Sequence, residues 1–83
     1  MNQKLLAAYD RYLESFNNLS PSDRQRIRSV ARYQLKAEGW PDIGSSDISA
    51  RVFALFREYG YFSPTVINTI AKNRSTSYNT LIH

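Results

Sequence analysis

The chain has 83 residues and a formal net charge of +4, with eleven Lys or Arg residues against seven Asp or Glu residues. This length predicts a single helical domain over residues 1–83 with a small core. The absence of cysteine excludes disulfides and thiolate metal sites, and a lone histidine at the last position argues against histidine-based catalysis. We therefore expect a cytoplasmic protein that is not an enzyme, has no cofactor and does not enter a membrane. Its positive charge favours an anionic partner, nucleic acid first.

The first predicted helix covers residues 2–17. Its apolar side chains recur at the spacing of one helical face. They are Leu5, Leu6, Tyr9, Leu13 and Phe16. Asp10 and Glu14 lie off this stripe, where we expect a solvated face or ion pairs with a neighbouring basic helix.

The second predicted helix covers residues 21–38. Ser20 caps its start, Pro21 takes the first helical position, and Gly39 ends it. Four basic residues follow each other at steps of four and form a basic stripe beside the apolar face: Arg24, Arg28, Arg32 and Lys36. The stripe has two interpretations, a set of phosphate contacts or a solvated face that pairs with the acids of the first helix.

A loop over residues 40–45 separates the second helix from the third. Trp40 and Ile43 are expected to fill the space beneath this loop, and base stacking or partner anchoring is the alternative role for Trp40. The third helix is predicted over residues 46–59, with Ser45 or Ser46 as its cap and Asp47 in its first turn.

Gly60 ends the third helix, and Ser63 with Pro64 starts a fourth over residues 63–73. A helix, a tight turn and a short helix have the layout of a helix-turn-helix. The tail over residues 74–83 is either a short helix from about Ser75 or a flexible end. The fold class is therefore all-α, a compact bundle of four helices.

Aromatic residues gather at the end of the third helix and in the turn after it. Phe53, Tyr61 and Phe62 form this aromatic edge. Such a cluster is most often part of a core, and the alternative is a surface that binds a partner protein.

A glycine turn, a Ser-Pro helix start and a Thr-Val pair follow one another in the second half of the chain. The residues concerned are Arg57, Glu58, Gly60, Ser63, Pro64, Thr65, Val66, Asn73, Arg74 and Ser75. This succession resembles the helix-turn-helix of the lac-repressor family. The turn is one residue longer here, and Phe56 stands where such motifs have a small residue between closely approaching helices.

The resemblance implies a DNA-binding regulator of the phage or plasmid type, whose last helix enters the major groove. The residues implied to face the groove are Thr65, Asn68, Thr69 and Lys72, and Asn68 is suited to adenine edges. Arg74 and the basic stripe would contact phosphates. Such proteins usually bind as dimers, so a homodimer through the first helix or the aromatic edge stays open. The competing hypothesis is a small interaction module that inhibits or adapts a partner protein.

Overall fold

The computed structural model describes the backbone of residues 2–82 and the side chains of residues 2–73. Over these residues the chain folds into helices joined by short connections, which confirms the all-α class and the four-helix bundle. The helices are α1 (Gln3–Asn17), α2 (Pro21–Ala37), α3 (Ser45–Tyr59) and α4 (Pro64–Ile82).

Two of the helices begin at a Ser-Pro pair, as the sequence predicts. The Ser20 hydroxyl accepts a hydrogen bond from the Asp23 N–H at 3.2 Å, and the Ser63 hydroxyl accepts one from the Val66 N–H at 3.2 Å. The proline after each serine occupies the first helical position, where no backbone N–H is needed. Both helix starts are therefore fixed by residues adjacent in the chain.

The start of α3 differs from the prediction, because Gly44 and not a serine is the N-cap residue. The Gly44 N–H donates to the Asp47 carboxylate at 2.9 Å, so the acid in the first turn stabilises this end. The ends of α2 and α3 follow the prediction. Gly39 and Gly60 have φ values of +90° and +92°, which residues with a Cβ rarely adopt.

The last helix is longer than predicted. It runs from Pro64 to Ile82 without a break, whereas the sequence indicated an end near residue 73. The Ser, Thr and Asn residues of this stretch have low helix propensity, which led to the shorter prediction. The predicted phosphate contact Arg74 lies in this stretch, outside the described side chains.

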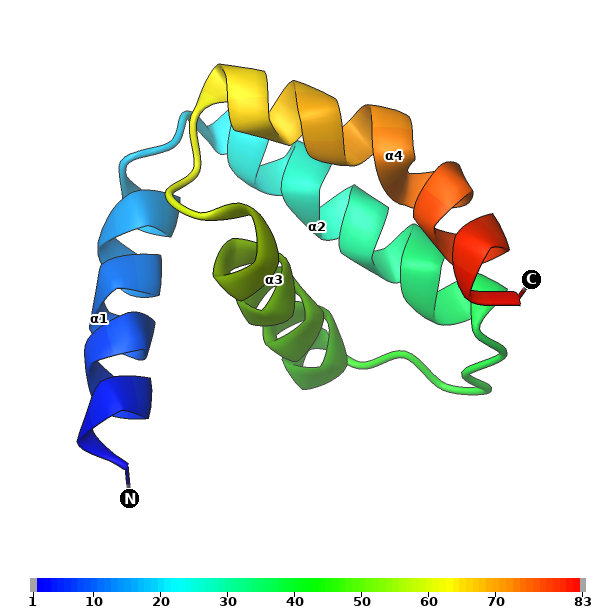
Figure 1. Ribbon diagram of the computed structural model, residues 1–83, viewed down its shortest axis with the longest axis horizontal. Helices are drawn as coiled ribbons and strands as arrows, with labels where there is room; N and C mark the ends of the chain where they lie inside the picture. Colours follow the sequence, from blue (N-terminus) through cyan, green and yellow to red (C-terminus); the bar gives the residue numbers. More distant parts are fainter. Residues whose placement is uncertain (1, 83) are drawn as a thin grey trace.

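The helices pack around α2, with α1 at one side (Figure 1). α2 and α4 lie side by side and run in the same direction, and α3 packs on another flank of α2 and returns toward their N-terminal ends. α1 stands at the edge of the molecule and packs on α3. α2 is thus the central helix, and α1 is the most peripheral one.

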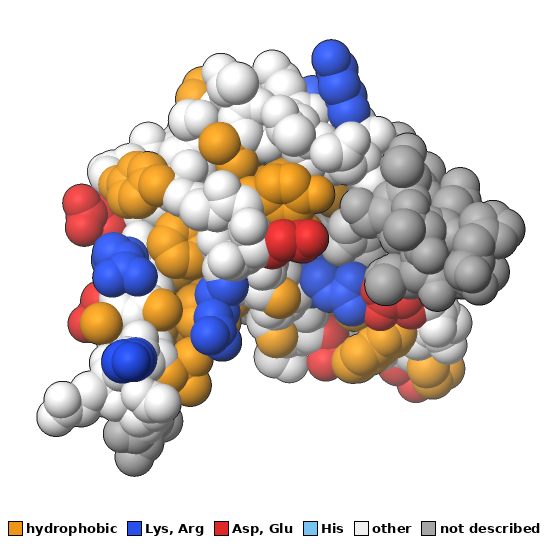
Figure 2. Space-filling model, viewed as in Figure 1, with side chains coloured by type: hydrophobic (Ala, Val, Ile, Leu, Met, Phe, Trp, Pro, Cys, Tyr) orange, Lys and Arg blue, Asp and Glu red, His pale blue; other side chains and the backbone are white. Residues whose placement is uncertain are grey.

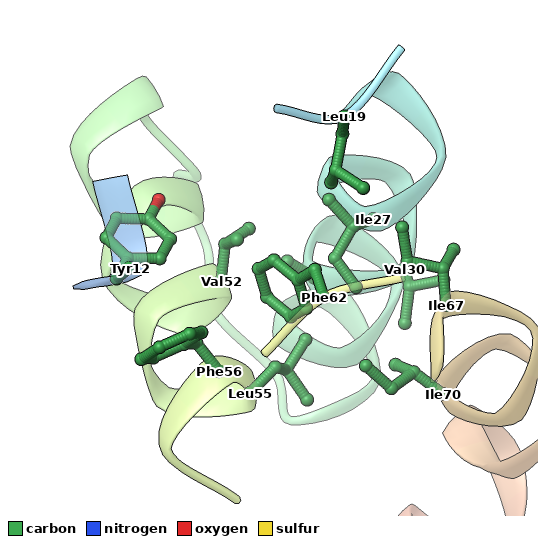
Figure 3. Close-up of a cluster of buried hydrophobic side chains, with 11 residues drawn as sticks. Tyr12, Leu19, Ile27, Val30, Val52, Leu55, Phe56, Phe62, Ile67 and Ile70 are labelled. Atoms are coloured by element: carbon green, nitrogen blue, oxygen red, sulfur yellow. The ribbon is translucent and has the colours of Figure 1, made fainter. Parts of the chain in front are cut away.

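All four helices, with the segments between them, contribute to one core (Figure 3). Its buried apolar side chains are Tyr12, Leu19, Ile27, Val30, Ala31, Leu35, Val52, Leu55, Phe56, Phe62, Ile67 and Ile70. Phe62 lies near the middle of the labelled group, although it belongs to the turn between α3 and α4. Its ring packs edge-on against Phe56, with ring centroids 5.6 Å apart.

Phe62 belongs to the core, which is the more usual of the two roles considered for the aromatic edge, and the alternative role of a partner contact is wrong for this residue. Only 3% of the residue is exposed, because the ring fills the core. Its backbone N–H is also inside, where it donates to the Ser15 hydroxyl of α1 at 2.7 Å. Ser15 has no exposed surface, so this bond satisfies a buried backbone donor and ties α1 to the α3–α4 turn.

We expect Ser15→Ala to lower the free energy of unfolding by about 1–3 kcal/mol, because the buried Phe62 N–H would lose its acceptor. Urea denaturation followed by circular dichroism measures this change. Ser46→Ala is the matched control, since Ser46 is an exposed residue of α3. The control should change stability by no more than about 0.5 kcal/mol. Equal effects of the two substitutions would contradict the role given to Ser15.

Candidate nucleic-acid interface

The basic stripe of α2 does not form one continuous surface. Arg24 donates to the backbone carbonyl of Asn17 at 3.3 Å. Arg28 donates to the hydroxyls of Ser49 and Ser45 at 3.2 and 3.3 Å, at the N-terminal end of α3. The first two arginines of the stripe are therefore turned toward the α1–α2 connection and α3.

Arg26, which the prediction left out, is the arginine that reaches α4. Residues two apart in a helix point about 200° apart, so Arg26 and Arg28 leave α2 on opposite flanks. The Arg26 guanidinium donates to the side-chain oxygen of Asn68. Asn68 is exposed, but it lies across α2 from Arg28. The expectation that the whole basic stripe and the polar side of α4 share a surface is therefore wrong.

The second half of the stripe turns toward the solvent side of α2. Each step of four residues rotates the side chain by about 40°, so Arg32 and Lys36 lie progressively further from α3. Both are exposed, as is Lys72 on α4. Within the described part of the chain, no hydrogen bond or ion pair engages these three side chains. Tyr33 and then Arg26 lie further around α2 in the same direction.

These residues define what we call the α2–α4 basic surface: Arg26, Arg32, Tyr33, Lys36, Asn68 and Lys72. A pocket of about 340 Å³ lies within it, lined by Arg26, Ser29, Val30, Tyr33 and Ala71. The pocket therefore combines aromatic and apolar lining with the positive charge of the Arg26 guanidinium. The sequence contained one signal for this arrangement, the spacing of Arg26, Ser29 and Tyr33 along one flank of α2.

The other residues predicted to face a groove lie further around α4. Thr65 and Thr69 are exposed, as expected for the outer side of the helix. The Thr69 hydroxyl donates to the Thr65 backbone carbonyl at 3.1 Å. While this bond is formed, the Thr69 hydroxyl can accept a hydrogen bond from a ligand but cannot donate one.

Positive charge is divided unequally between the helices. The cations of the α2–α4 pair are Arg24, Arg26, Arg28, Arg32, Lys36, Lys72 and Arg74, whereas its acids are Asp23 and the C-cap residue Glu38. α1 and α3 are balanced, with Lys4, Arg11, Arg51 and Arg57 against Asp10, Glu14, Asp47 and Glu58. Figure 2 shows this mixture as acidic and basic side chains interspersed over α1 and α3. The surplus charge of the protein therefore belongs to α2 and α4.

One ion pair is present among the described side chains, between Arg51 and Glu38. The two guanidinium nitrogens contact the two carboxylate oxygens at 2.6 and 2.5 Å, and Arg51 also donates to Gln34 at 3.2 Å. The hydrogen bond from Arg51 lowers the pKa of Glu38, and the same bond raises the pKa of Arg51. This pair joins the C-terminal end of α2 to α3 and removes Arg51 from the cations that are free for a ligand.

The aromatic residues outside the core occupy three different environments. Phe53 is half-buried and packs edge-on against Tyr9, with ring centroids 5.4 Å apart. Tyr61 is exposed, and its hydroxyl accepts from the Asn18 side chain at 3.1 Å. Trp40 is 44% exposed, so the expectation that it fills the space beneath its loop is wrong. Of the predicted aromatic edge, Phe53 and Tyr61 remain accessible.

Residues 2–73 contain no cluster of His, Asp or Glu side chains with the composition of a metal site. In the described part of the chain, each helix is too short or too polar to cross a bilayer. No protein-family model, no curated protein and no solved structure matches the chain.

We expect Glu38→Gln to cost at most about 1 kcal/mol at neutral pH, because both partners of the ion pair are partly exposed and water screens their attraction. The folded protein lowers the pKa of Glu38, so the pair stabilises the fold above the ordinary carboxyl pKa. This contribution is lost as the pH falls through the lowered pKa. The stability difference between wild type and variant, measured by urea denaturation, should therefore disappear once the pH is below the lowered pKa of Glu38. A difference that persists there would contradict an ionic origin.

Proposed function

We propose that the protein binds nucleic acid through the α2–α4 basic surface, and that duplex DNA is its principal target. The observation that supports this is the concentration of the surplus cations on two adjacent helices. Arg32, Lys36 and Lys72 extend into solvent without an acidic partner among the described side chains. Like charges on one helix repel each other, and phosphate groups would relieve that repulsion. The proposed role is a small DNA-binding regulator of the phage or plasmid type, acting in the cytoplasm.

Asn68 gives this proposal a specific contact. An asparagine amide pairs with adenine by accepting from one base nitrogen and donating to another. In the free protein, the Asn68 oxygen already accepts from Arg26. Binding to adenine would therefore release Arg26, whose guanidinium could then contact a phosphate. On this account, Asn68 contributes to sequence preference, and Arg26 contributes to affinity.

The pocket between α2 and α4 would contribute differently to the binding of duplex and of single-stranded ligands. An unpaired base can stack on an aromatic side chain beside an arginine, whereas a base within a duplex is not available for stacking. If a single strand bound more tightly than the duplex of the same sequence, the principal target would be single-stranded. Tyr33→Leu should then weaken binding of the single strand and leave duplex binding unchanged.

We expect the affinity for random duplex DNA to fall linearly on a plot of log affinity against log salt. Lys36→Gln and Lys72→Gln should each weaken binding and reduce the slope by about 1, because each removes one phosphate contact. Fluorescence anisotropy at several salt concentrations measures both quantities. Lys4→Gln is the matched control, since Lys4 is an exposed lysine on α1 and the change in net charge is the same.

The comparison with Lys4→Gln separates a binding surface from the effect of net charge alone. If the three variants weaken binding equally, the α2–α4 basic surface has no special role. An affinity that does not change between low and moderate salt would contradict nucleic-acid binding as such.

A protein partner is the second candidate, and one observation favours it. Leu6 and Tyr9 of α1 are 46% and 45% exposed, although the spacing of the α1 apolar residues is that of a packed helix. This surface lies on the helix that is most distant from the basic pair α2 and α4 (Figure 1). Protein binding through α1 and nucleic-acid binding through α2 and α4 are therefore compatible.

A further inference from the structure

α1 has apolar side chains that the rest of the described chain covers only in part. Tyr12 and Ser15 are its buried residues, and both face α3 and the α3–α4 turn. The neighbouring side of the same helix is at least one-third exposed at each of four apolar positions. These residues, which we call the exposed α1 face, are Leu5, Leu6, Tyr9 and Leu13.

The spacing along the exposed α1 face suits a second helix. Leu6, Tyr9 and Leu13 are separated by three and then four residues, which is the pattern of a coiled-coil seam. Such a seam pairs with another seam of the same spacing. A second copy of this chain presents that spacing by necessity, and a twofold dimer brings the same surface of each copy together.

The two edges of the exposed α1 face differ in charge. Asp10 lies on the outer edge, because four residues of helix place it about 40° around from Leu6. On the edge toward α3, Tyr9 packs against the Phe53 ring. The guanidinium of Arg57 lies over that ring, 5.9 Å from its centroid. Arg57 has no ion-pair partner within residues 2–73.

We propose that the exposed α1 face is the interface of a homodimer in which the two α1 helices run parallel about a twofold axis. A twofold axis along the helices exchanges the two edges of the interface. The acidic edge of one copy then faces the edge of the other copy that carries Arg57, so Asp10 and Arg57 attract each other across the interface. An antiparallel pair would instead bring each acidic edge against its own counterpart and cause repulsion.

This inference is independent of nucleic-acid binding, because it uses α1 and α3 and not the α2–α4 basic surface. If both proposals are correct, the dimer presents two copies of the basic surface to the same nucleic acid. Measurements without nucleic acid test the dimer alone, so its failure would leave the proposed function untouched.

Sedimentation equilibrium of the full chain, at increasing protein concentration and without nucleic acid, should show conversion from monomer to dimer. Leu6→Asp should raise the dissociation constant at least about tenfold, because it places a charge in the seam. Ala7→Asp is the matched control, because Ala7 is exposed and the substitution adds the same charge. Ala7 lies about 100° around α1 from Leu6, outside the seam, so this variant should leave the dimer unchanged. Circular dichroism should show that both variants stay folded, since both positions are exposed.

A wild-type chain that remains a monomer at all concentrations would overturn the proposal. A dimer that Leu6→Asp does not weaken would also overturn it, since another surface would then form the interface. The charge pairing has its own test. Arg57→Glu should weaken the dimer, and Asp10→Arg in the same chain should restore it. Failure of that restoration would overturn the parallel arrangement.

Discussion

One aromatic residue in a turn determines how the helices fit together. Phe62 follows α3 and precedes α4, and its ring packs against Phe56 of α3 and Tyr12 of α1. Its backbone N–H is held by Ser15 of α1. Because the turn is anchored in the core in this way, α4 begins at a fixed place beside α2. The geometry of the α2–α4 basic surface therefore depends on a contact in which none of its cations takes part.

The molecule separates its charge from its exposed apolar surface. α2 and α4 carry the surplus of positive charge, and α1 and α3 carry balanced charges and the exposed α1 face. Arg24 and Arg28 donate to uncharged oxygens, and no acid among the side chains of residues 2–73 pairs with either of them. A protein that binds a polyanion on one side and a second copy of itself on another would have this division.

The boundaries of the helices were largely predictable because the signals are local. Two helices begin at a serine followed by proline, Ser20 and Ser63. Two helices end at a glycine, Gly39 and Gly60. Each of these signals lies within a few residues of the helix end that it determines. The exception is α4, whose C-terminal half has low intrinsic helix propensity, so its residue types left open whether this half is helical, and the predicted helix ended near residue 73.

The candidate site was only partly predictable. Periodicity identifies the apolar side of a helix, but not which neighbour covers it. The sequence therefore could not show that α4 lies on the Arg26 flank of α2, or that the exposed α1 face stays uncovered. For the same reason, it left Phe62 open between the core and a partner surface, and it placed Trp40 in the interior. These assignments depend on contacts between residues far apart in the chain.

Binding at the α2–α4 basic surface is tested most directly by titrating the protein with duplex DNA and following the backbone amide chemical shifts by NMR. The shifts should change along the solvent side of α2 and along α4, centred on Arg26, Lys36 and Lys72, and should stay constant in α1. Changes confined to α1 and the adjoining part of α3, or no changes at all at low salt, would contradict it.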